Sequence, residues 1–364
     1  MINTQVSVSV VTYTFNDHHL VEGLIASMER WSVRPKELII VDDGSRESYV
    51  PRQPPPRDIG TQVIRQEANA GPTRTKHLGL SAASSKFLLS IDADARIDDD
   101  WLERCLPLAA GKDVGMVSTP VSYESGCGPT ARYLHLTYSD RRKAGETSFI
   151  PGPVFLMRRS VFAEVGGFSG YPDKIGEDDY LCRLLASRKF RLLLTDLSRA
   201  RQIRRLSRTT VIRRGFTWQK NTFLREIDRG TPLMEVLSVF LHGVGRRPCM
   251  VQADDPWLTY HDLLYATYGF LELSKQRPEA SDMIKAALRA CLSGYPRLRS
   301  QLERDLARCG LDLIPCGNPP AREFPPYAAV FTRHMLARMN EACSGETDEL
   351  AEDEDYSMYK DLGD

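Results

Sequence analysis

Short apolar runs alternate with amphipathic segments along the first part of the chain. The β-rich runs are residues 6–12, 37–41, 62–65 and 86–91, and the segments with helical spacing are residues 18–31 and 73–83. Asp17 precedes the first predicted helix and suits its N-terminal cap. This alternation predicts an α/β fold with an open parallel sheet, and strands that are apolar throughout are typical of a sheet covered on both faces.

The pattern changes near Arg214. Before that point further strands are expected at residues 114–119, 149–155 and 191–195, and beyond it helices are expected at 231–241, 261–274, 280–292, 297–307 and 327–343. We therefore predict an α/β domain over residues 1–214, a mainly α-helical C-terminal region over 215–345 and an acidic, flexible tail over 346–364. The aromatic residues of the helical region are expected in its core rather than on a sugar-stacking surface; they include Trp218, Trp257, Tyr260, Tyr265 and Tyr268.

Charge and composition narrow the class of protein. Lys plus Arg equals Asp plus Glu at 48 each, so net charge does not favour a nucleic-acid partner. The Arg-rich stretch 199–214 contains no acidic residue and indicates a local anionic partner, either a diphosphate or an anionic membrane surface. We find no apolar run long enough to cross a bilayer and no N-terminal signal segment. The eight Cys are scattered without a CxxC pair, which predicts free thiols in a reducing cytoplasm.

The first motif with candidate chemistry is Asp92-Ala93-Asp94, at the end of the fourth β-rich run. Two carboxylates one residue apart can bind a hard divalent cation. The carboxyl ends of strands in an open α/β sheet are also where ligands bind. Alone, the motif is equally compatible with a solvated acidic turn.

Two further motifs suit nucleotide binding. Asp43, within the segment DDGS that ends the second run, can accept a hydrogen bond from a base or ribose, although Asp and Gly are also frequent in plain turns. Gly71 lies in a glycine loop just before the second predicted helix and Lys76 lies within that helix, an arrangement that can contact phosphate. A glycine turn followed by a surface lysine is the simpler interpretation of that segment alone.

The fourth motif is the acidic cluster Glu177-Asp178-Asp179 at the start of a predicted helix. Acids in a first helical turn are favoured by the helix dipole, which needs no further function. The functional interpretation is that one of them is a general base, which takes a proton from an attacking hydroxyl group.

In their order and spacing these motifs resemble the family-2 glycosyltransferases of the GT-A fold. The resemblance extends from about residue 6 to residue 210. It rests on six blocks, which are VSVVTYTFN (8–16), ELIIVDDGS (37–45), NAGPTRTKHLGL (69–80), KFLLSIDADARI (86–97), RRSVFAEVGGF (158–168) and GEDDYLCRLL (176–185). The implied fold is the Rossmann-like open sheet of the nucleotide-diphospho-sugar transferases, followed here by the helical region.

The resemblance implies a role for each matching residue. Asp178 corresponds to the catalytic base, with Glu177 beside it. Asp94 corresponds to the more direct ligand of a Mg²⁺ or Mn²⁺ ion, with Asp92 in the same motif. The acceptor side is implied for Gly167 and Phe168, and the implied donor-binding residues are Thr12, Phe15, Asp43, Gly71, Lys76, Asp92 and Arg204.

The sequence also departs from the family pattern. Tyr13 stands where the family usually has Pro, and Lys76 and His77 stand where it has Arg and Asn. Many relatives have a His about 25 residues after the base that can complete the metal site, whereas residues 199–205 of this chain contain arginines and no His. Arginine cannot bind a cation but can neutralise a leaving diphosphate. The site therefore either binds its metal with fewer protein ligands or uses arginine charge.

The implied activity is inverting transfer of a sugar from a UDP-, GDP- or dTDP-linked donor to a hydroxyl of a cell-surface glycan or lipid-linked saccharide, with a metal ion at the diphosphate. A protein or peptide acceptor and a catalytically inactive sugar-nucleotide-binding module are the alternatives. A nucleotidyltransferase is expected to open with a glycine-rich basic loop, which residues 10–17 lack. Acceptor recognition and homo-oligomerisation are both open roles for the helical region, and contact with the cytoplasmic face of the inner membrane is an open role for the arginines.

Overall fold

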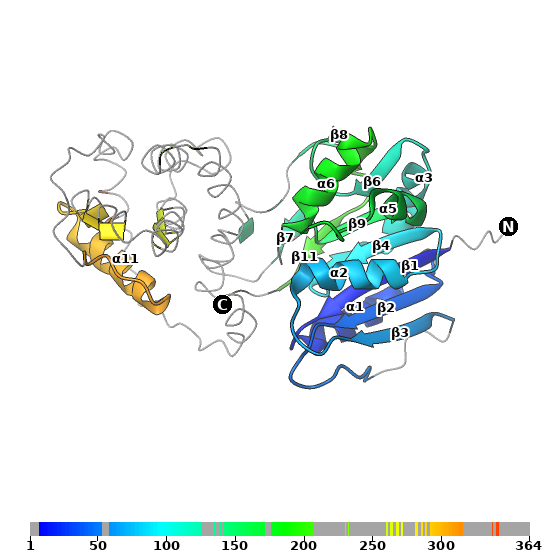
Figure 1. Ribbon diagram of the computed structural model, residues 1–364, viewed down its shortest axis with the longest axis horizontal. Helices are drawn as coiled ribbons and strands as arrows, with labels where there is room; N and C mark the ends of the chain where they lie inside the picture. Colours follow the sequence, from blue (N-terminus) through cyan, green and yellow to red (C-terminus); the bar gives the residue numbers. More distant parts are fainter. Residues whose placement is uncertain are drawn as a thin grey trace. The chain divides into compact units, whose positions relative to one another are not determined.

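A computed structural model of the chain describes residues 7–52, 58–124, 142–171 and 176–204 of its first part and residues 292–315 of its second part, together with isolated positions elsewhere. The described elements belong to two compact units (Figure 1). The first contains the helices and strands up to residue 204, and the second contains the elements after residue 206. The predicted boundary at Arg214 and the acidic tail lie outside the described residues.

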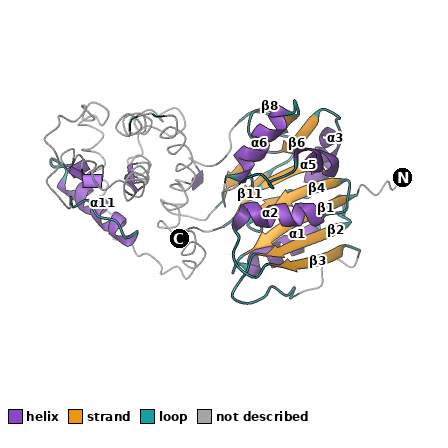
Figure 2. Ribbon diagram, in the orientation of Figure 1, coloured by secondary structure: helices purple, strands orange, loops and turns teal. Residues whose placement is uncertain are grey.

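The first unit alternates strands and helices (Figure 2). Its strands are β1 (Val8–Thr14), β2 (Glu37–Asp42), β3 (Gly60–Arg65), β4 (Phe87–Ile91), β5 (Ala95–Ile97), β6 (Val114–Ser118), β7 (Val121–Tyr123), β8 (Gly145–Thr147), β9 (Val154–Arg158), β10 (Arg191–Leu194) and β11 (Ala200–Gln202). Its helices are α1 (His18–Met28), α2 (Gly71–Ala82), α3 (Trp101–Ala109), α5 (Arg159–Val165) and α6 (Glu177–Ser187). The predicted elements up to residue 91 are confirmed within a few residues, whereas the strand expected at 149–155 begins at Val154.

The main sheet is mixed, which corrects the prediction of a parallel sheet. Its strand order is β3-β2-β1-β4-β9-β6-β10-β8. Strands β3, β2, β1 and β4 are mutually parallel, and β6 is parallel to β10. Strand β9 runs antiparallel between β4 and β6, and β8 runs antiparallel beside β10. A parallel sheet was expected because strand direction at an insertion of this kind depends on long-range pairing, which apolar periodicity does not encode.

Helices cover both faces of the sheet, as the apolar strands predicted. Alternate strand residues belong to two separate core clusters, so that Val10 packs on one face and Val11 on the other. Helices α1 and α3 contribute to the first cluster, and α2, α5 and α6 contribute to the second. The carboxyl ends of the central strands are thereby left as the edge at which polar residues can gather.

Helix α2 approaches the sheet closely at Gly79. A Cβ atom at this position would lie 2.5 Å from Cγ1 of Val11 and 3.0 Å from Cγ2 of Val41. Glycine is unfavourable inside a helix, so its presence here is explained by the short distance between the helix and strands β1 and β2. This packing fixes the position of Lys76, one helical turn earlier, against the end of the sheet.

A small second sheet lies within the first unit, in the order β5-β11-β7. Strand β11 is antiparallel to β5, with Gln202 opposite Ala95. Strands of three residues have too short a pattern for sequence analysis to detect, and none of the three was predicted. The pairing matters because it brings the residues after Gln202 to the segment that follows β4.

The second unit contains α11 (Pro296–Arg308), which confirms the helix predicted at 297–307. Leu298, Leu302 and Leu306, each fully buried, form its apolar face at a spacing of four residues. Tyr260 and Tyr268 are also buried, so the core position predicted for them is confirmed. Trp218, Trp257 and Tyr265 lie outside the described residues, as do all or parts of the other helices predicted there. No helix in the described part of the chain is long and apolar enough to span a membrane.

Candidate active site

The predicted donor-binding residues gather at one edge of the main sheet. Phe15, Asp43 and Asp92 each follow directly on a strand, namely β1, β2 and β4. These strands are neighbours and parallel, so their carboxyl ends lie at the same edge. The strand pairing therefore brings the ends of the first, second and fourth β-rich runs to one place.

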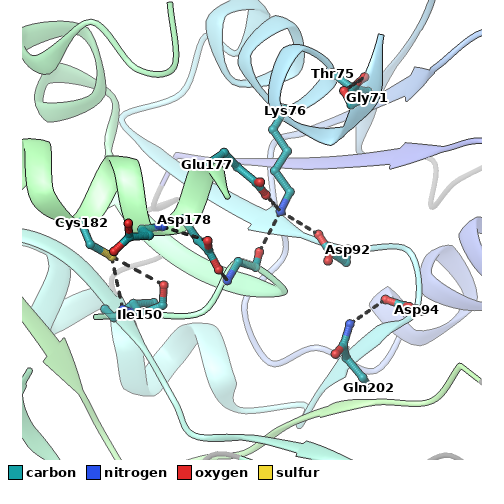
Figure 3. A network of polar contacts seen from close by, with 12 residues as sticks. Gly71, Thr75, Lys76, Asp92, Asp94, Ile150, Glu177, Asp178, Cys182 and Gln202 are labelled. Carbon is teal, nitrogen blue, oxygen red and sulfur yellow. Dashed lines mark hydrogen bonds and ion pairs between the residues drawn. The ribbon is translucent and has the colours of Figure 1, made fainter. Parts of the chain in front are cut away.

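Lys76 is the centre of a buried polar network at this edge (Figure 3). Its Nζ atom lies 2.8 Å from Oε1 of Glu177 and 3.2 Å from Oδ1 of Asp92, and it donates a 3.1 Å hydrogen bond to the carbonyl oxygen of Gly152. The side chain of Lys76 is 3% exposed, so its charge is compensated by these partners rather than by water. Burial alone would lower the pKa of Lys76, but the carboxylates of Asp92 and Glu177 hold it well above its usual value. Lys76 is therefore a permanently charged link between the two acidic motifs.

The pKa of Asp92 is also raised, which for a carboxyl group favours the neutral form. Burial raises the pKa of its carboxyl group to about 7, and repulsion from Asp94 and Glu177 adds to this, while Lys76 opposes it. Tyr13 lies over the same network, with its ring centroid 5.5 Å from Nζ of Lys76. Burial and the negative charge of Asp92 raise the pKa of Tyr13, so its hydroxyl group stays protonated. Such perturbed groups at a sheet edge are typical of functional sites.

Asp178 occupies the first turn of α6 beside this network. Its Oδ2 atom accepts a hydrogen bond of 3.1 Å from the backbone N–H of Gly152. The backbone of Gly152 thus joins Asp178 to Lys76, because its N–H group donates to Asp178 and its carbonyl oxygen accepts from Lys76. Gly152 was missed in the sequence, where the only signal is its position between Pro151 and Pro153 ahead of β9.

The three acids that begin α6 have different environments. Glu177 is bound to Lys76, and Asp179 forms a 3.0 Å ion pair with Arg183 on the exposed side of the helix. Within the described part of the chain Asp178 makes no ion pair, and its side chain is partly exposed. Burial raises the pKa of Asp178 to about 6, and the neighbouring Glu177 raises it further while Lys76 and two backbone N–H groups lower it. Of the three, Asp178 therefore best fits a proton acceptor.

Asp43 is used largely for internal contacts. Its carboxylate accepts hydrogen bonds from the backbone N–H groups of Ala70 and Gly71, at 2.8 and 3.0 Å, and from the side chain of Gln66. Gly71 has a φ of +82°, a conformation that favours glycine and that turns its N–H toward Asp43. Burial raises the pKa of Asp43. The hydrogen bonds from Ala70 and Gly71 to Asp43 hold the N-terminus of α2 at the end of β2. The base-reading role predicted for Asp43 stays a prediction.

The remaining predicted residues differ in exposure. Thr12 is fully buried, and within the described residues its hydroxyl group has no hydrogen-bond partner, whereas Phe15 is partly exposed at the end of β1. Phe168 is 2% exposed and contacts the ring of Phe162 edge-on, and Gly167 has a φ of +57°. Gly167 and Phe168 thus follow α5 and its C-cap residue Gly166, and Phe168 packs against Phe162 of the helix. The donor and acceptor roles predicted for these residues stay predictions.

Asp94 is enclosed by a second polar cluster. Its Oδ2 atom lies 2.9 Å from Nε of Arg204, and its Oδ1 atom accepts a 3.2 Å hydrogen bond from the side-chain amide of Gln202. Nη2 of Arg204 also lies 2.7 Å from Oδ2 of Asp17. Asp17 does precede α1, but its side chain makes no capping hydrogen bond, which corrects the predicted capping role. The sequence placed Arg204 among the donor-binding residues but did not predict its ion pairs, because Asp17 and Asp94 are far from Arg204 in the sequence.

The described residues do not fit the predicted Mg²⁺ or Mn²⁺ site. A hard divalent cation needs several oxygen ligands that are available to it. Both carboxylate oxygens of Asp94 receive donors from Arg204 and Gln202, and Asp92 contacts Lys76. In the described part of the chain no group of three or more His, Cys, Asp and Glu residues is placed to bind a metal ion. Cationic side chains therefore occupy the neighbourhood in which the sequence predicts a metal.

The first part of the chain is similar to known glycosyltransferases. The model of glycosyl transferase family 2 matches residues 9–166, which include β1 through β9 and α5. The chain is 29% identical over 160 residues to the pre-mycofactocin glycosyltransferase of Mycobacterium tuberculosis, covering 42% of this chain and 34% of that protein. It is 27% identical over 184 residues to the glucosyl-dolichyl phosphate glucuronosyltransferase of Haloferax volcanii, covering 48% of this chain and 58% of that protein.

Two sugar-nucleotide complexes are among the solved structures to which the chain is similar. The mannosyltransferase PcManGT of Pyrobaculum calidifontis, in complex with GDP-Man and Mn²⁺, has a TM-score of 0.43 and 17% identity, covering 95% of this chain and 89% of that one. S. aureus TarS with UDP-GlcNAc has a TM-score of 0.44 and 14% identity, covering 82% of this chain and 88% of that one. The chain spans about a third of the length of the mycobacterial relative.

Proposed function

Because the chain belongs to glycosyl transferase family 2 and has the mixed open sheet of the GT-A fold, we propose that it is an inverting glycosyltransferase. It moves a sugar from a nucleotide-diphosphate donor to a hydroxyl group of an acceptor. The donor binds at the carboxyl ends of β1, β2 and β4, near Phe15, Asp43 and Asp92, with Lys76 and Arg204 as the nearby cations. The acceptor approaches the start of α6, where Asp178 lies.

The proposed reaction is a single displacement. The acceptor oxygen forms a bond to the anomeric carbon while the bond from that carbon to the diphosphate oxygen breaks, so the configuration inverts. The acceptor proton passes to the carboxylate of Asp178, and the electron pair of the broken bond leaves with the nucleoside diphosphate. Asp178 contributes as a general base, an effect worth about 10²–10⁴ in rate.

The observation that carries this proposal is the difference between the environments of the Glu177 and Asp178 carboxylates. Lys76 lies 2.8 Å from Glu177, while Asp178 is oriented by two backbone N–H groups and has its pKa raised to about 6. A carboxylate with this pKa is ionised at neutral pH yet accepts a proton more readily than an ordinary aspartate. Its position also leaves it partly exposed, as an approaching acceptor requires.

The donor base, the sugar and the acceptor belong to this proposal in general terms only. We favour a UDP-, GDP- or dTDP-linked sugar and a cell-surface glycan or lipid-linked acceptor. The name of the archaeal relative, which acts on glucosyl-dolichyl phosphate, supports a lipid-linked acceptor. A protein or peptide acceptor is the alternative, since the region after Arg214 is long enough to recognise one. Peripheral contact with a membrane through the Arg-rich stretch would agree with a lipid-linked acceptor.

The experiment that tests the proposal begins with the donor. A thermal-shift screen of UDP-, GDP- and dTDP-sugars identifies a ligand because binding to the native state raises the melting temperature. Hydrolysis or transfer of that donor is then measured for the wild type and for Asp178→Asn, with Glu177→Gln and Asp179→Asn in parallel. We expect Asp178→Asn to lose about two to four decades of rate with little change in donor affinity, because the base acts on the acceptor.

The outcomes separate the alternatives. If Asp179→Asn loses transfer while Asp178→Asn keeps it, the base is assigned to the wrong residue. Full activity in all three variants would contradict a carboxylate base at the start of α6. Donor binding without turnover by the wild type, with any acceptor class supplied, would instead support the sugar-nucleotide-binding module.

A further inference from the structure

We propose that Arg204 supplies the positive charge at Asp94, so that the site binds a nucleoside diphosphate without a divalent metal ion. This inference deepens the proposed function and rests on it. It concerns the position at which the sequence predicts Mg²⁺ or Mn²⁺ and at which the structure places a guanidinium group.

The backbone fixes Arg204 at this position. Strand β11 pairs with β5 so that Gln202 lies opposite Ala95, and the N–H of Ile203 donates a 2.9 Å hydrogen bond to the carbonyl oxygen of Asp94. Arg204 is the next residue along the chain. Its place beside Asp94 therefore follows from a strand pairing and not from the free rotation of a long surface side chain.

The side-chain contacts are those of a compensated buried charge. Arg204 bridges Asp94 and Asp17, at 2.9 and 2.7 Å, and the three side chains are only 11%, 6% and 5% exposed. Two carboxylates so close together in a dry environment need a cation between them. Arg204 provides one, and Gln202 donates to the remaining oxygen of Asp94.

Arg204 and a metal ion would compete for the same position beside the carboxylate of Asp94. A divalent cation at Asp94 would have to displace the guanidinium group, and the two positive charges would then repel each other at close range. An arginine, by contrast, can serve the diphosphate directly. It has five N–H donors in a planar arrangement that matches phosphate oxygens, and Nε and Nη2 make the contacts to the two carboxylates. With a His in place of Arg204, the positive charge at the diphosphate would come from the metal ion that the His binds.

The first test measures metal binding directly and needs no donor. Electron paramagnetic resonance of Mn²⁺ titrated with the full chain reports how much Mn²⁺ is bound. We expect no stoichiometric uptake by the wild type, and uptake by Arg204→Ala that is lost again in the double variant Arg204→Ala/Asp94→Asn. Arg204→His is the second variant, in case Arg204→Ala fails to fold, because a neutral imidazole is itself a metal ligand. Stoichiometric Mn²⁺ uptake by the wild type that Asp94→Asn abolishes would overturn the proposal.

The second test measures nucleotide binding. Affinities for UDP and GDP are compared by calorimetry in EDTA and in Mn²⁺. Arg201→Ala is the control, because Arg201 lies on β11 shortly before Arg204 but pairs with the more exposed Asp98 and Glu124. We expect the wild type and Arg201→Ala to bind equally under both conditions. Arg204→Ala should bind about tenfold more weakly in EDTA, the loss of one charge-assisted contact, and regain affinity with Mn²⁺.

The two tests distinguish the two proposals. Nucleotide binding by the wild type that requires Mn²⁺ would overturn the role of Arg204. If neither nucleotide binds under either condition, nor any dTDP-sugar in the thermal-shift screen, the proposed function itself fails, while the Mn²⁺ titration still decides which cation occupies the site at Asp94.

Discussion

The Nζ atom of Lys76 lies 2.8 Å from Oε1 of Glu177, although the two residues are 101 positions apart in the sequence. This contact joins α2 to the start of α6, and the same ammonium group also binds Asp92 at the end of β4. The acidic residues around Lys76 have different roles. Glu177 and Asp92 compensate the lysine, and Asp178, next along the helix, is the proton acceptor of the proposed reaction.

Replacing Lys76 by Met should destabilise the protein. The substitution leaves Glu177 and Asp92 without their cation, and their side chains are only 10% and 16% exposed. Removing one partner of a buried ion pair typically costs about 3–5 kcal/mol. We expect a loss of this size in urea unfolding at neutral pH. Arg74→Met is the matched control, because Arg74 lies on the same helix with an exposed side chain, and it should leave the midpoint almost unchanged. Equal midpoints for both variants would contradict a stabilising network.

The pH dependence of transfer should follow Asp178. Because burial raises the pKa of Asp178 to about 6, the carboxylate needed as a base is lost as the pH falls below that value. At saturating substrate the rate should therefore decline about tenfold for each pH unit below 6. The low residual rate of Asp178→Asn should lack this decline. An unchanged acidic limb in that variant would assign the limb to another group.

Protonation of Asp178, which should lower the rate of transfer, should stabilise the folded protein. Its pKa is higher in the folded protein than the ordinary value of 3.8, so the folded state binds the proton more tightly. The resulting stabilisation is complete below the unfolded pKa and is lost as the pH rises toward about 6. Relative to Asp178→Asn, the wild type should lose stability between pH 4 and pH 7. Thermal unfolding of both proteins across this range measures the difference, and parallel curves would argue against a raised pKa.

Gly152→Ala should impair the site more than the fold. A Cβ atom there would lie 3.0 Å from Nζ of Lys76 and 3.5 Å from Cβ of Asp178, so it would displace the lysine or the start of α6. We expect transfer to fall at least tenfold, since a small misplacement of catalytic groups is costly. Gly294→Ala is the control, because nothing lies within 4 Å of a Cβ at that position. Transfer at the wild-type rate by Gly152→Ala would show that the backbone N–H group of Gly152 does not position Asp178.

The elements that the sequence predicted well are those with a local signal. Strands β1, β2 and β4 are short apolar runs, and Phe15, Asp43 and Asp92, which follow them, lie at one edge because neighbouring parallel strands end together. Glu177 and Asp178 were placed at a helix start because acids are favoured there, and they do begin α6. For these features the relation between pattern and structure spans only a few residues.

The features that were missed depend on contacts between distant segments. The antiparallel insertion of β9 brings Gly152 beside Asp92, and no periodicity within residues 149–158 specifies the strand's direction. The ion pairs of Arg204 with Asp94 and Asp17 join residues more than 100 positions apart and depend on the three-residue strand β11. Asp17 shows the same limitation, since its position before a helix suggested a cap and its partner came from elsewhere.

Gly79→Ala should lower stability although alanine favours helices. The added Cβ would lie 2.5 Å from Cγ1 of Val11 and 3.0 Å from Cγ2 of Val41, both in the core. Overpacking typically costs about 1–3 kcal/mol, and the gain in helix propensity recovers up to about 1 kcal/mol. We expect a net loss of about 1–2 kcal/mol in the free energy of unfolding. Ser81→Ala, on the exposed side of the same helix, should be neutral or slightly stabilising. A more stable Gly79→Ala would mean that α2 can move away from the sheet.

The domain boundary predicted near Arg214 is testable by limited proteolysis of the full chain. The strands and helices up to residue 204 contain both core clusters of the main sheet, and a unit with its own core can persist after cleavage outside it. We therefore expect a protease to leave an N-terminal fragment of about 200–220 residues, within the usual size of a domain. Mass spectrometry of the surviving fragment locates the cut, and a thermal-shift measurement with the donor found for the full chain shows whether the fragment still binds it. A fragment that binds the donor but does not transfer would assign acceptor recognition to the helical region. Degradation without a stable intermediate would instead show that the two units depend on each other for stability.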